Sequence, residues 1–466
     1  MRSLTEKVAD FIATSHYDEM PQESVSAAKG CLLDGLGCAL AGATEQVSSI
    51  VTEYVRELGG KPRATVIMGG FKTSPPLAAL VNGVMIHALD YDDNCYSLPL
   101  HPSAVLLPAV LATGELCHAS GKEVIEAYII GYEIAVRLGR SLQEHYYDGG
   151  WHNTATVGSL GAAAASAKIL KLSNQQIRFA LGIAASEAAG LRKNFGTMTK
   201  PFHAGNAAKS GIVAASLAAK GFSSDNGILE GRLGFCTSLG GSEETLMKLM
   251  ETLGFSYEMA SPGVLLKAYP SCFGTHKCIE GMLYLKNKHG FNARDIVEIE
   301  VETDAVLPQV LKYHQPKTPL EARFSLEYCA AIAAQDGRVG LEQFSWAKVR
   351  DPQVQQLQQR VKYVHTDDAA AQKRQPDYPE RVMVKLQDGK LYDHTVQIVK
   401  GDPRNPMTET ERVSKYLECA SLVLPQGNAE KLLSLMSNLE AIDDISKVTN
   451  VVLSTGRKSH TKSRTR

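Results

Sequence analysis

The stretch Gly158-Ser-Leu-Gly-Ala-Ala-Ala-Ala-Ser166 decides the fold class of this 466-residue chain. Leu160 is its only large side chain, and a second stretch, Ala184-Ala-Ser-Glu-Ala-Ala-Gly190, has a similar composition. Small side chains allow two helix axes to approach closely. We therefore expect both stretches to lie in the buried centre of a helical bundle.

Helical spacing continues on both sides of these stretches. In 26–42 and in 121–138 apolar residues recur every four positions, which predicts helices with one buried face. The whole of 1–265 has this character, so we expect one large, all-helical domain there.

The hydrophobic period changes after about residue 290. In 297–302 apolar residues alternate with glutamates, which predicts a half-exposed strand. A hairpin is expected over 382–398, because two alternating runs flank Asp388-Gly389. The stretches 319–336 and 340–362 have helical patterns. Residues 266–401 are therefore expected to form a smaller α+β domain.

The C-terminal part returns to helical spacing over 409–445, after the break at Gly401-Asp-Pro-Arg-Asn-Pro406. We therefore expect 402–455 to rejoin the first domain, which makes that domain discontinuous. The last stretch, 456–466, has five Lys or Arg in its final ten residues and is expected to be a disordered, solvated end.

Composition and charge exclude several classes of protein. With 49 basic and 50 acidic residues the formal net charge is −1, so no polyanionic partner such as nucleic acid is expected. No apolar run approaches the roughly 20 residues of a membrane span, so no membrane association is expected. Nine scattered cysteines, no Cys-x-x-Cys pair and no secretory signal indicate reduced thiols and a cytoplasmic location.

Four short segments gather titratable side chains beside Pro, Gly or Asn at the edges of small-residue stretches. They are His87-Ala-Leu-Asp-Tyr-Asp-Asp-Asn94 with His101-Pro-Ser103, Trp151-His-Asn-Thr154, Met198-Thr-Lys-Pro-Phe-His203 with Ala-Gly-Asn206, and Tyr269-Pro-Ser-Cys-Phe-Gly-Thr-His276. Loops and helix ends expose side chains and backbone N–H groups. This layout suits a site that holds anions and moves protons.

In this order the four segments resemble the MmgE/PrpD family, which includes dehydratases of 2-methylcitrate, decarboxylases of cis-aconitate and epimerases of iminodisuccinate. The resemblance runs from the N-terminus to Pro-Met-Thr at 406–408. It implies a mainly α fold in which a smaller α+β lid is inserted into a discontinuous helical domain. It also implies a homodimer and catalysis of a small di- or tricarboxylate without a metal or other cofactor.

The resemblance, together with the residue types, gives candidate site residues. The candidates for catalysis are His152, Asp90, His101, Lys200 and His276, and the candidates for substrate binding are Asn94, Lys200, His101, His276, Tyr328 and Tyr146. The histidines and the lysine offer donors and proton carriers for exchange at a carbon α to a carboxylate, with Asp90 or Asp93 orienting a histidine. Tyr146 or Tyr147 could supply a second proton carrier in an epimerase, although packing is an equal alternative.

Other residues in these segments have a structural interpretation. Asp92 and His87 are expected to be structural, His203 and Asn206 to fix the backbone of a loop, Lys209 to lie at the surface and Cys272 to be packed as a small apolar group. Tyr328 is equally well explained as a core residue. Asp90, Asp92, Asp93 and His101 resemble a metal cluster in type, but their spacing matches no metal motif.

A lyase, either dehydratase or decarboxylase, is the expected enzyme class. The alternatives are an epimerase or isomerase of an iminodisuccinate-like dicarboxylate and a catalytically silent binding protein of the same fold. Between Asp93 and His101 the chain lacks the tryptophan and glycine that precede His-Pro in 2-methylcitrate dehydratases, and Asn94 stands where they commonly have threonine. Both differences weigh against 2-methylcitrate as the substrate.

Overall fold

The first small-residue stretch lies in the buried centre of the helical part of the molecule, as expected. The expectation is wrong for the second, in which only Ala184 is buried and the rest is half-buried or exposed. A computed structural model describes residues 3–142, 144–305, 307–364 and 378–453. The first stretch lies within α8 (Val157–Ile169), as expected. The second is helical only as far as Ser186, where α9 (Asn174–Ser186) ends, so Gly190 lies beyond the helix.

Glycines let the central helices pack closely. A Cβ atom on Gly205 of α10 (Thr199–Ala218) would lie 2.1 Å from the carbonyl oxygen of Leu80 in α4 (Pro75–His87). A Cβ on Gly161 of α8 would lie 2.8 Å from the carbonyl oxygen of Gly131 in α6 (Gly121–Ser141). No side chain fits in either contact, so glycine is required there. The predicted close packing of small-residue helices is confirmed.

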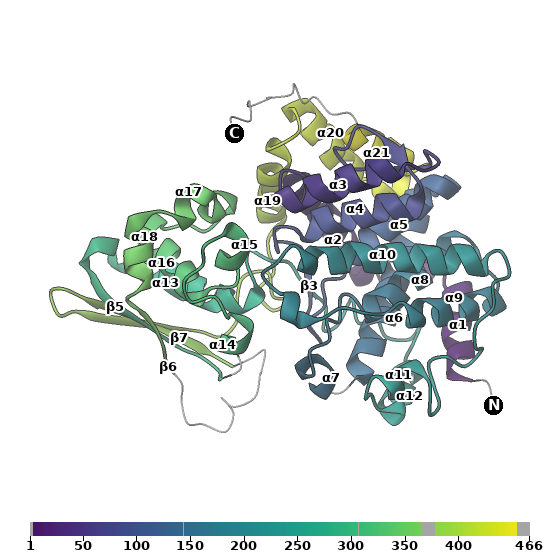
Figure 1. Cartoon of the computed structure of the whole chain (residues 1–466), viewed down its shortest axis with the longest axis horizontal. Helices are drawn as coiled ribbons and strands as arrows, with labels where there is room; N and C mark the ends of the chain where they lie inside the picture. The colour runs from purple at the N-terminus through teal and green to yellow at the C-terminus, as the bar shows by residue number, and fades with distance from the viewer. Residues whose placement is uncertain (1–2, 143, 306, 365–377, 454–466) are drawn as a thin grey trace.

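The helical body surrounds this centre and is closed by helices from both ends of the chain (Figure 1). Its remaining helices are α1 (Leu4–Thr14), α2 (Gln22–Gly42), α3 (Gln46–Leu58), α5 (Ser103–Cys117), α7 (Glu144–Asp148), α11 (Phe235–Ser238), α12 (Glu243–Glu251), α19 (Glu409–Ser421), α20 (Gln426–Ser437) and α21 (Ser446–Leu453). Two short ladders interrupt it, β1 (Ala64–Thr65) with β2 (Lys72–Thr73), and β3 (Asn94–Cys95) with β4 (Val264–Leu265). These ladders are not expected from the helical spacing.

One helix, α2, is long and apolar enough to cross a membrane by length and composition. No membrane span is expected from the sequence. In this structure 72% of its most apolar window is buried, and α2 packs against α4 and α19. These contacts are those of a core helix.

The smaller unit is a four-stranded sheet covered by helices, with a core separate from that of the helical body (Figure 1). The strands, in the order β6-β5-β7-β8, are β5 (Ile296–Glu302), β6 (Val361–Val364), β7 (Glu380–Leu386) and β8 (Leu391–Val396). The helices are α13 (His276–His289), α14 (Leu307–Val310), α15 (Pro319–Ala322), α16 (Leu326–Asp336), α17 (Trp346–Val349) and α18 (Pro352–Gln358). The predicted hairpin is confirmed, since β7 and β8 pair across Gly389, whose φ is +84°.

The helical pattern expected over 340–362 is confirmed as far as Gln358, but it is broken into short pieces and ends at a strand. This stretch contains two short helices and the parallel strand β6. The Ser345 hydroxyl accepts a hydrogen bond from the Lys348 N–H, and the Asp351 carboxylate accepts one from the Gln353 N–H. Each side chain caps a new helix, so the chain restarts its helical structure instead of continuing it.

Two connecting segments join the units, and they lie beside each other. The Leu266 N–H donates to the Gly401 carbonyl at 3.0 Å, and a Cβ on Gly401 would lie 1.8 Å from the Leu266 carbonyl oxygen. After this crossing, residues of α19 to α21 join the core of the first helices. We therefore propose the division into 1–265, 266–401 and 402–455, while the basic stretch 456–466 lies outside the described residues.

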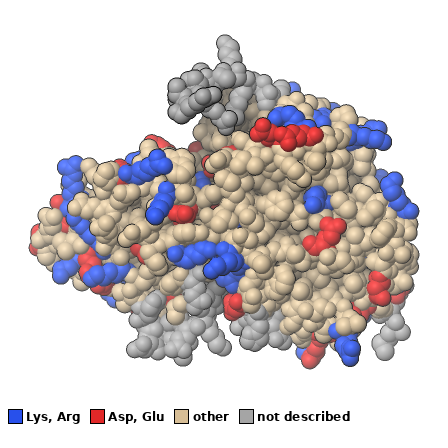
Figure 2. Space-filling view, viewed as in Figure 1, with Lys and Arg blue, Asp and Glu red and all other residues tan. Residues whose placement is uncertain are grey.

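The visible surface of the molecule carries both signs of charge. Figure 2 shows Lys and Arg interspersed with Asp and Glu over the helical body and the smaller unit, separated by wide uncharged areas. This distribution agrees with the net charge of −1. On this face there is no broad basic surface for a polyanion.

Candidate active site

Asp90 is the centre of a buried cluster of cations and histidines. It follows α4 in the left-handed backbone region, with φ at +51°, which aspartate tolerates better than most residues. Its Oδ1 accepts hydrogen bonds from the ammonium groups of Lys200 at 3.0 Å and Lys267 at 2.7 Å. Burial alone would raise the pKa of Asp90, but Lys200 and Lys267 hold it well below its ordinary value. Asp90 is therefore a permanent anion that anchors two lysines.

Lys267 is the principal residue that the sequence interpretation missed. Its side chain is fully buried and also donates to the Asp90 carbonyl at 2.9 Å. Lys415 of α19 holds this region in place, because its ammonium donates hydrogen bonds to the carbonyls of Tyr91 and Lys267. The same ammonium pairs with Asp34 at 2.7 Å. The available signal was a lysine two residues before Tyr269-Pro-Ser, within an otherwise apolar run.

Asp92 orients two histidines. One of its oxygens lies 2.9 Å from His87 Nδ1 and 3.4 Å from His101 Nδ1. His101 Nδ1 also lies 3.0 Å from the Asp93 carbonyl, so Nδ1 must carry the proton. The His101 Nε2 then faces Asp90 Oδ1 at 3.7 Å. Asp92 therefore has the structural role expected for it, and this role sets the tautomer of His101.

His87 is only partly satisfied. Its Nδ1 is paired with Asp92, but its Nε2 is buried and has no partner within the described residues. The sequence interpretation treated His87 as a satisfied structural histidine. That interpretation is wrong for Nε2, which is not satisfied. The centre of the His87 ring lies 4.4 Å from that of His101 and 6.3 Å from that of His152.

Lys200 lies in the first turn of α10 and His203 at the start of the second, where a loop was expected. The loop was inferred from Pro201, but proline is tolerated in the first helical turn because N–H groups there have no helical partner. His203 Nδ1 lies 3.1 Å from the Nδ1 of His152, which precedes α8. His203 therefore contacts a predicted catalytic residue, and Asn206 is likewise helical, so neither residue fixes a loop.

Asp93 is held away from the cluster. Its carboxylate accepts hydrogen bonds from the N–H and the hydroxyl of Ser103 at 2.9 and 2.8 Å, and from the Tyr128 hydroxyl at 3.3 Å. Burial, with Asp92 nearby, raises the pKa of Asp93 to about 7. Its side chain caps α5, and it acts on His101 only through its backbone carbonyl.

His276 and Asn94 present unpaired polar atoms near the cluster. His276 is fully buried at the start of α13, against the rings of Tyr269 and Phe273, and neither ring nitrogen has a hydrogen-bond partner of normal geometry within the described residues. Burial and Lys267 lower the pKa of His276 to about 3. Asn94 lies in β3, and its buried Oδ1 is also unpaired. Unpaired buried polar atoms are costly, which favours a ligand-binding interpretation.

Arg323 adds a third buried cation that the sequence interpretation missed. It is 2% exposed, its Nε and Nη1 atoms have no partner within the described residues, and Glu45 is 4.0 Å from Nη2. The next residue, Phe324, lies with Phe195 around the Lys200 ammonium, whose nitrogen is 5.2 and 5.3 Å from the two ring centres. The smaller unit thus brings one cation and one ring to the cluster. The signal was the arginine directly before Phe324-Ser-Leu-Glu-Tyr328.

Three other candidates lie apart from these contacts. The Tyr328 hydroxyl donates to the carbonyl of Gln343 within the core of the smaller unit, which favours the packing alternative. Tyr146 stacks on Trp151 at 6.2 Å. Burial raises the pKa of the Cys272 thiol, which agrees with the packed role expected for it.

Four of the clustered residues could hold a metal ion by geometry alone. One ligand atom from each of His87, Asp90, Asp92 and His101 lies within 4.8 Å of the others. Asp90 Oδ1, however, is already paired with two ammonium groups, and a divalent cation there would be repelled by both. The two ammonium groups therefore oppose a metal at Oδ1, while Asp90 Oδ2 is buried without a partner within the described residues.

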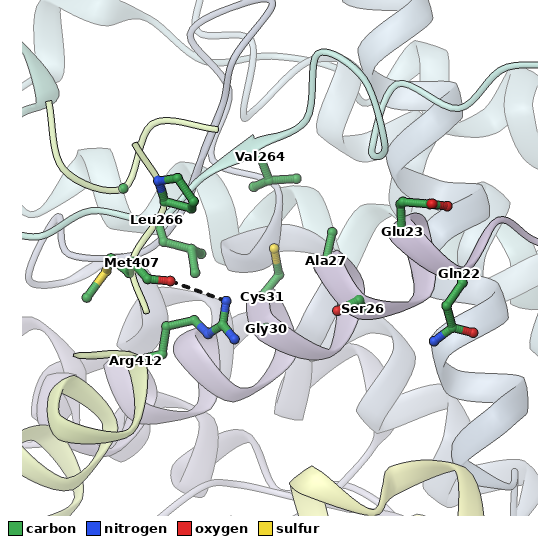
Figure 3. Close-up of a pocket in the computed structure, with 12 residues that line it drawn as sticks. Gln22, Glu23, Ser26, Ala27, Gly30, Cys31, Val264, Leu266, Met407 and Arg412 are labelled. Atoms are coloured by element: carbon green, nitrogen blue, oxygen red, sulfur yellow. Dashed lines mark hydrogen bonds between the residues drawn. The ribbon is translucent and has the colours of Figure 1, made fainter. Parts of the chain in front are cut away.

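A separate cavity of about 410 Å³ lies against α2, at the crossing between the units (Figure 3). Its lining is mainly apolar, with Cys31 and Leu266 in the middle and Arg412 at one end, where Arg412 donates to the Met407 carbonyl. None of the predicted site residues lines it. We assign the chemistry to the Asp90 cluster, because titratable groups converge there.

The buried histidines should make stability depend on pH. The pKa values of His101 and His276 are lowered by burial to about 3, and that of His203 to about 4. The unfolded chain therefore binds more protons than the folded chain below about pH 6.5, so stability falls as the pH falls from there towards 4. Each ring contributes at most about 1.4 kcal/mol per pH unit.

We expect His276→Gln to reduce the slope of unfolding free energy against pH, measured by urea unfolding between pH 6.5 and 4.5. The matched control is His16→Gln, since His16 is exposed, and this change should leave the slope as in the parent protein. Equal slopes in His276→Gln and the parent would contradict the neutral, buried state of His276.

Comparison with known proteins gives two family matches and a set of relatives. The MmgE/PrpD N-terminal domain model matches residues 6–246, and the MmgE/PrpD C-terminal domain model matches 269–441. The chain is 29% identical to the cis-aconitate decarboxylase of Homo sapiens, over 97% of this chain and 95% of the relative. It is 26% identical to that of Aspergillus terreus, over 95% and 94%.

Proposed function

The chain belongs to the MmgE/PrpD family, and from this premise we propose its function. Like its relatives, it is an enzyme of the lyase class that acts on a carboxylate. We propose that it is a cofactor-independent decarboxylase of a cis-aconitate-like tricarboxylate. The observation that carries this proposal is the unused hydrogen-bonding capacity of buried cations, on Lys200 beside Asp90 and on Arg323. The homodimer and the cytoplasmic location belong to the same proposal and rest on the family and the composition.

Buried cations in this region keep donors that the described residues leave unused. Lys200, Lys267 and Arg323 are buried, and both lysines converge on one oxygen of Asp90. Lys200 donates one hydrogen bond within the described residues, and Arg323 keeps two unpaired nitrogens. A planar guanidinium binds a carboxylate through two parallel hydrogen bonds. A substrate with several carboxylates would supply the missing acceptors.

Loss of carbon dioxide from such a substrate requires one proton. The bond between the methylene carbon and its carboxylate breaks, and its electron pair forms a terminal alkene. The electrons of the former double bond then take a proton at the carbon α to a second carboxylate. One tricarboxylate and one proton therefore give carbon dioxide and a methylene-substituted dicarboxylate. The enzyme needs cations for the carboxylates and a proton donor on one face.

His152 is the proton donor in this proposal. Its Nδ1 is occupied by His203, while its Nε2 has no partner within the described residues and is not sealed from solvent. Lys200, Lys267 and Arg323 would hold carboxylates, together with His101, His276 and Asn94. Burial and Lys200 lower the pKa of His152 well below its ordinary value. His152 is therefore neutral, and it donates the proton that a neutral ring carries on Nε2.

Arg323→Met should raise KM by about 10- to 100-fold with a smaller change in kcat, because a hydrogen bond to a charged group is worth about 1.5–3 kcal/mol. Steady-state kinetics on the converted substrate measures this. Arg323→Lys should recover only part of the loss, since an ammonium cannot form the paired contact. Arg338→Met, at an arginine that is 67% exposed in its side chain, is the control. An unchanged KM in Arg323→Met would remove Arg323 from the site.

Proton NMR in deuterium oxide tests the function. Purified protein dialysed against EDTA is incubated separately with cis-aconitate, citrate, 2-methylcitrate and iminodisuccinate. We expect cis-aconitate to lose its vinyl signal while two terminal alkene signals appear and one deuterium enters the adjacent methylene group. Full activity after EDTA would support catalysis without a metal.

Other outcomes would contradict the proposal. Deuterium exchange in iminodisuccinate with the skeleton unchanged would indicate the epimerase. Water loss from citrate or 2-methylcitrate would indicate a dehydratase. Thermal stabilisation by a tricarboxylate without turnover of any compound would indicate a binding protein.

A further inference from the structure

His203 forms a direct pair with His152 that the chemistry above does not use. The two Nδ1 atoms lie 3.1 Å apart, and the ring centres 5.4 Å apart. His203 lies one turn after Lys200 on α10, while His152 precedes α8, so two different helices bring the rings together. A hydrogen bond between two Nδ1 atoms needs the proton on one and a lone pair on the other.

This geometry couples the tautomers of the two neutral rings. When His203 carries its proton on Nδ1, His152 carries its own on Nε2 and is an acid towards the site. When His152 carries its proton on Nδ1, its Nε2 is a base. Transfer of the shared proton therefore converts His152 from one form to the other.

Both ends of the pair are open. No hydrogen bond within the described residues involves the Nε2 atom of either ring, and neither atom is among the fully enclosed polar atoms. Gly190 covers the pair with backbone alone: its carbonyl accepts from the His152 N–H at 3.0 Å, and a Cβ there would lie 3.4 Å from the His203 ring and 2.4 Å from Ala155. Glycine leaves room for His203 to reach His152.

The charged neighbours of the pair are all basic. His152 is faced by Lys200 on α10, His87 at the end of α4 and His101 on the loop before α5. Lys200 and His87 also face His203. Burial, with His87 and Lys200, lowers the pKa of His203 to about 4. Near pH 7 both rings are therefore neutral, which is the state that tautomer exchange requires.

We propose that His203 is the positioning and proton-relay residue of His152, which passes a solvent proton to the site through the shared Nδ1 contact. This rests on the proposed function, in which His152 protonates the substrate. As the Nε2 proton of His152 moves to the substrate carbon, the Nδ1 proton of His203 moves to His152 Nδ1. His203 Nε2 takes a proton from water, so both rings end neutral in the opposite tautomers. To restore the pair, His152 Nε2 takes a proton from water that enters the emptied site, His152 Nδ1 returns its proton to His203 Nδ1, and His203 Nε2 releases one to solvent.

His203→Asn tests the relay. An asparagine amide N–H can reach the position of Nδ1 and hold His152, but it cannot release its proton. We expect kcat for cis-aconitate to fall by about 10- to 100-fold, with KM nearly unchanged. Phe202→Leu, at the exposed neighbouring residue, is the control and should keep full activity. Full kcat in His203→Asn would overturn the relay.

His203→Gly with added imidazole supplies a readout that a purely structural role would not move. We expect imidazole to restore kcat in this variant in proportion to its neutral form, and to leave Phe202→Leu unchanged. No restoration, with the protein folded, would overturn the relay.

Nitrogen-15 NMR of the histidine rings separates this inference from the proposed function, because it needs no turnover. We expect His152 and His203 to have complementary tautomers in the parent protein, assigned through His203→Asn. Two rings that both carry their protons on Nε2 would overturn the pair even if cis-aconitate is converted. Complementary tautomers without conversion would uphold the pair and contradict only the function.

Discussion

His152→Ala is expected to lower kcat by about 10²- to 10⁴-fold, the usual contribution of a positioned proton carrier. His152 is 1% exposed, and its contacts are with His203 and the ring of Phe195 at 4.9 Å. Loss of the ring removes the group that delivers the proton but leaves the small-residue helices intact. Decarboxylation followed by NMR or by the release of carbon dioxide measures the effect.

Two controls accompany this prediction. The melting temperature should change by only a few degrees, which excludes unfolding as the cause. His16→Ala, at an exposed histidine far along the chain, should keep full activity. Undiminished turnover in His152→Ala would remove His152 from the mechanism.

Asp90→Asn is expected to lower the free energy of unfolding by about 3–5 kcal/mol, the cost of leaving buried charges without their partner. Asparagine also tolerates the left-handed backbone at this position, so the change removes charge without adding strain. The ammonium groups of Lys200 and Lys267 then face each other with no anion between them. Urea unfolding measures the loss.

A second variant identifies the cause. Asp90→Asn combined with Lys200→Met should be more stable than Asp90→Asn alone, because one unpaired ammonium has been removed. Asp388→Asn, which breaks an exposed pair with Lys390, should change stability by less than about 1 kcal/mol. If Asp90→Asn is as stable as the parent, Asp90 does not carry the charge balance of the cluster.

The sequence predicted the fold class because local patterns determine it. Small residues in 158–166 indicated closely packed helices, and the alternation in 382–398 indicated the hairpin that pairs across Gly389. The helical pattern over 340–362 does not reveal the breaks between its short helices, where Ser345 and Asp351 cap new helix starts, or the strand β6 at its end. A side-chain cap competes with a continuing periodic pattern and can end it.

The site was predicted in part. His101, Lys200 and Asp90 come together as expected, since each stands in a segment with unusual turn or helix-end chemistry. Lys267 and Arg323 were missed because their roles depend on long-range packing. Lys267 reaches Asp90 only because β4 pairs with β3, and nothing near Lys267 in the sequence reveals that pairing.

The buried contact of Lys415 has a consequence for the order in which the chain can fold during synthesis. The Lys415 ammonium pairs with Asp34 and donates to the carbonyls of Tyr91 and Lys267. Asp34, in the first tenth of the chain, therefore acquires its partner only when Lys415, near the end of the chain, has been made. A nascent chain that has completed the first 265 residues still has Asp34 without its cation. The smaller unit and α19 must both be synthesised before Lys415 can form the contacts that fix the segments around Asp90. Activity should therefore appear only late in translation, in a single step.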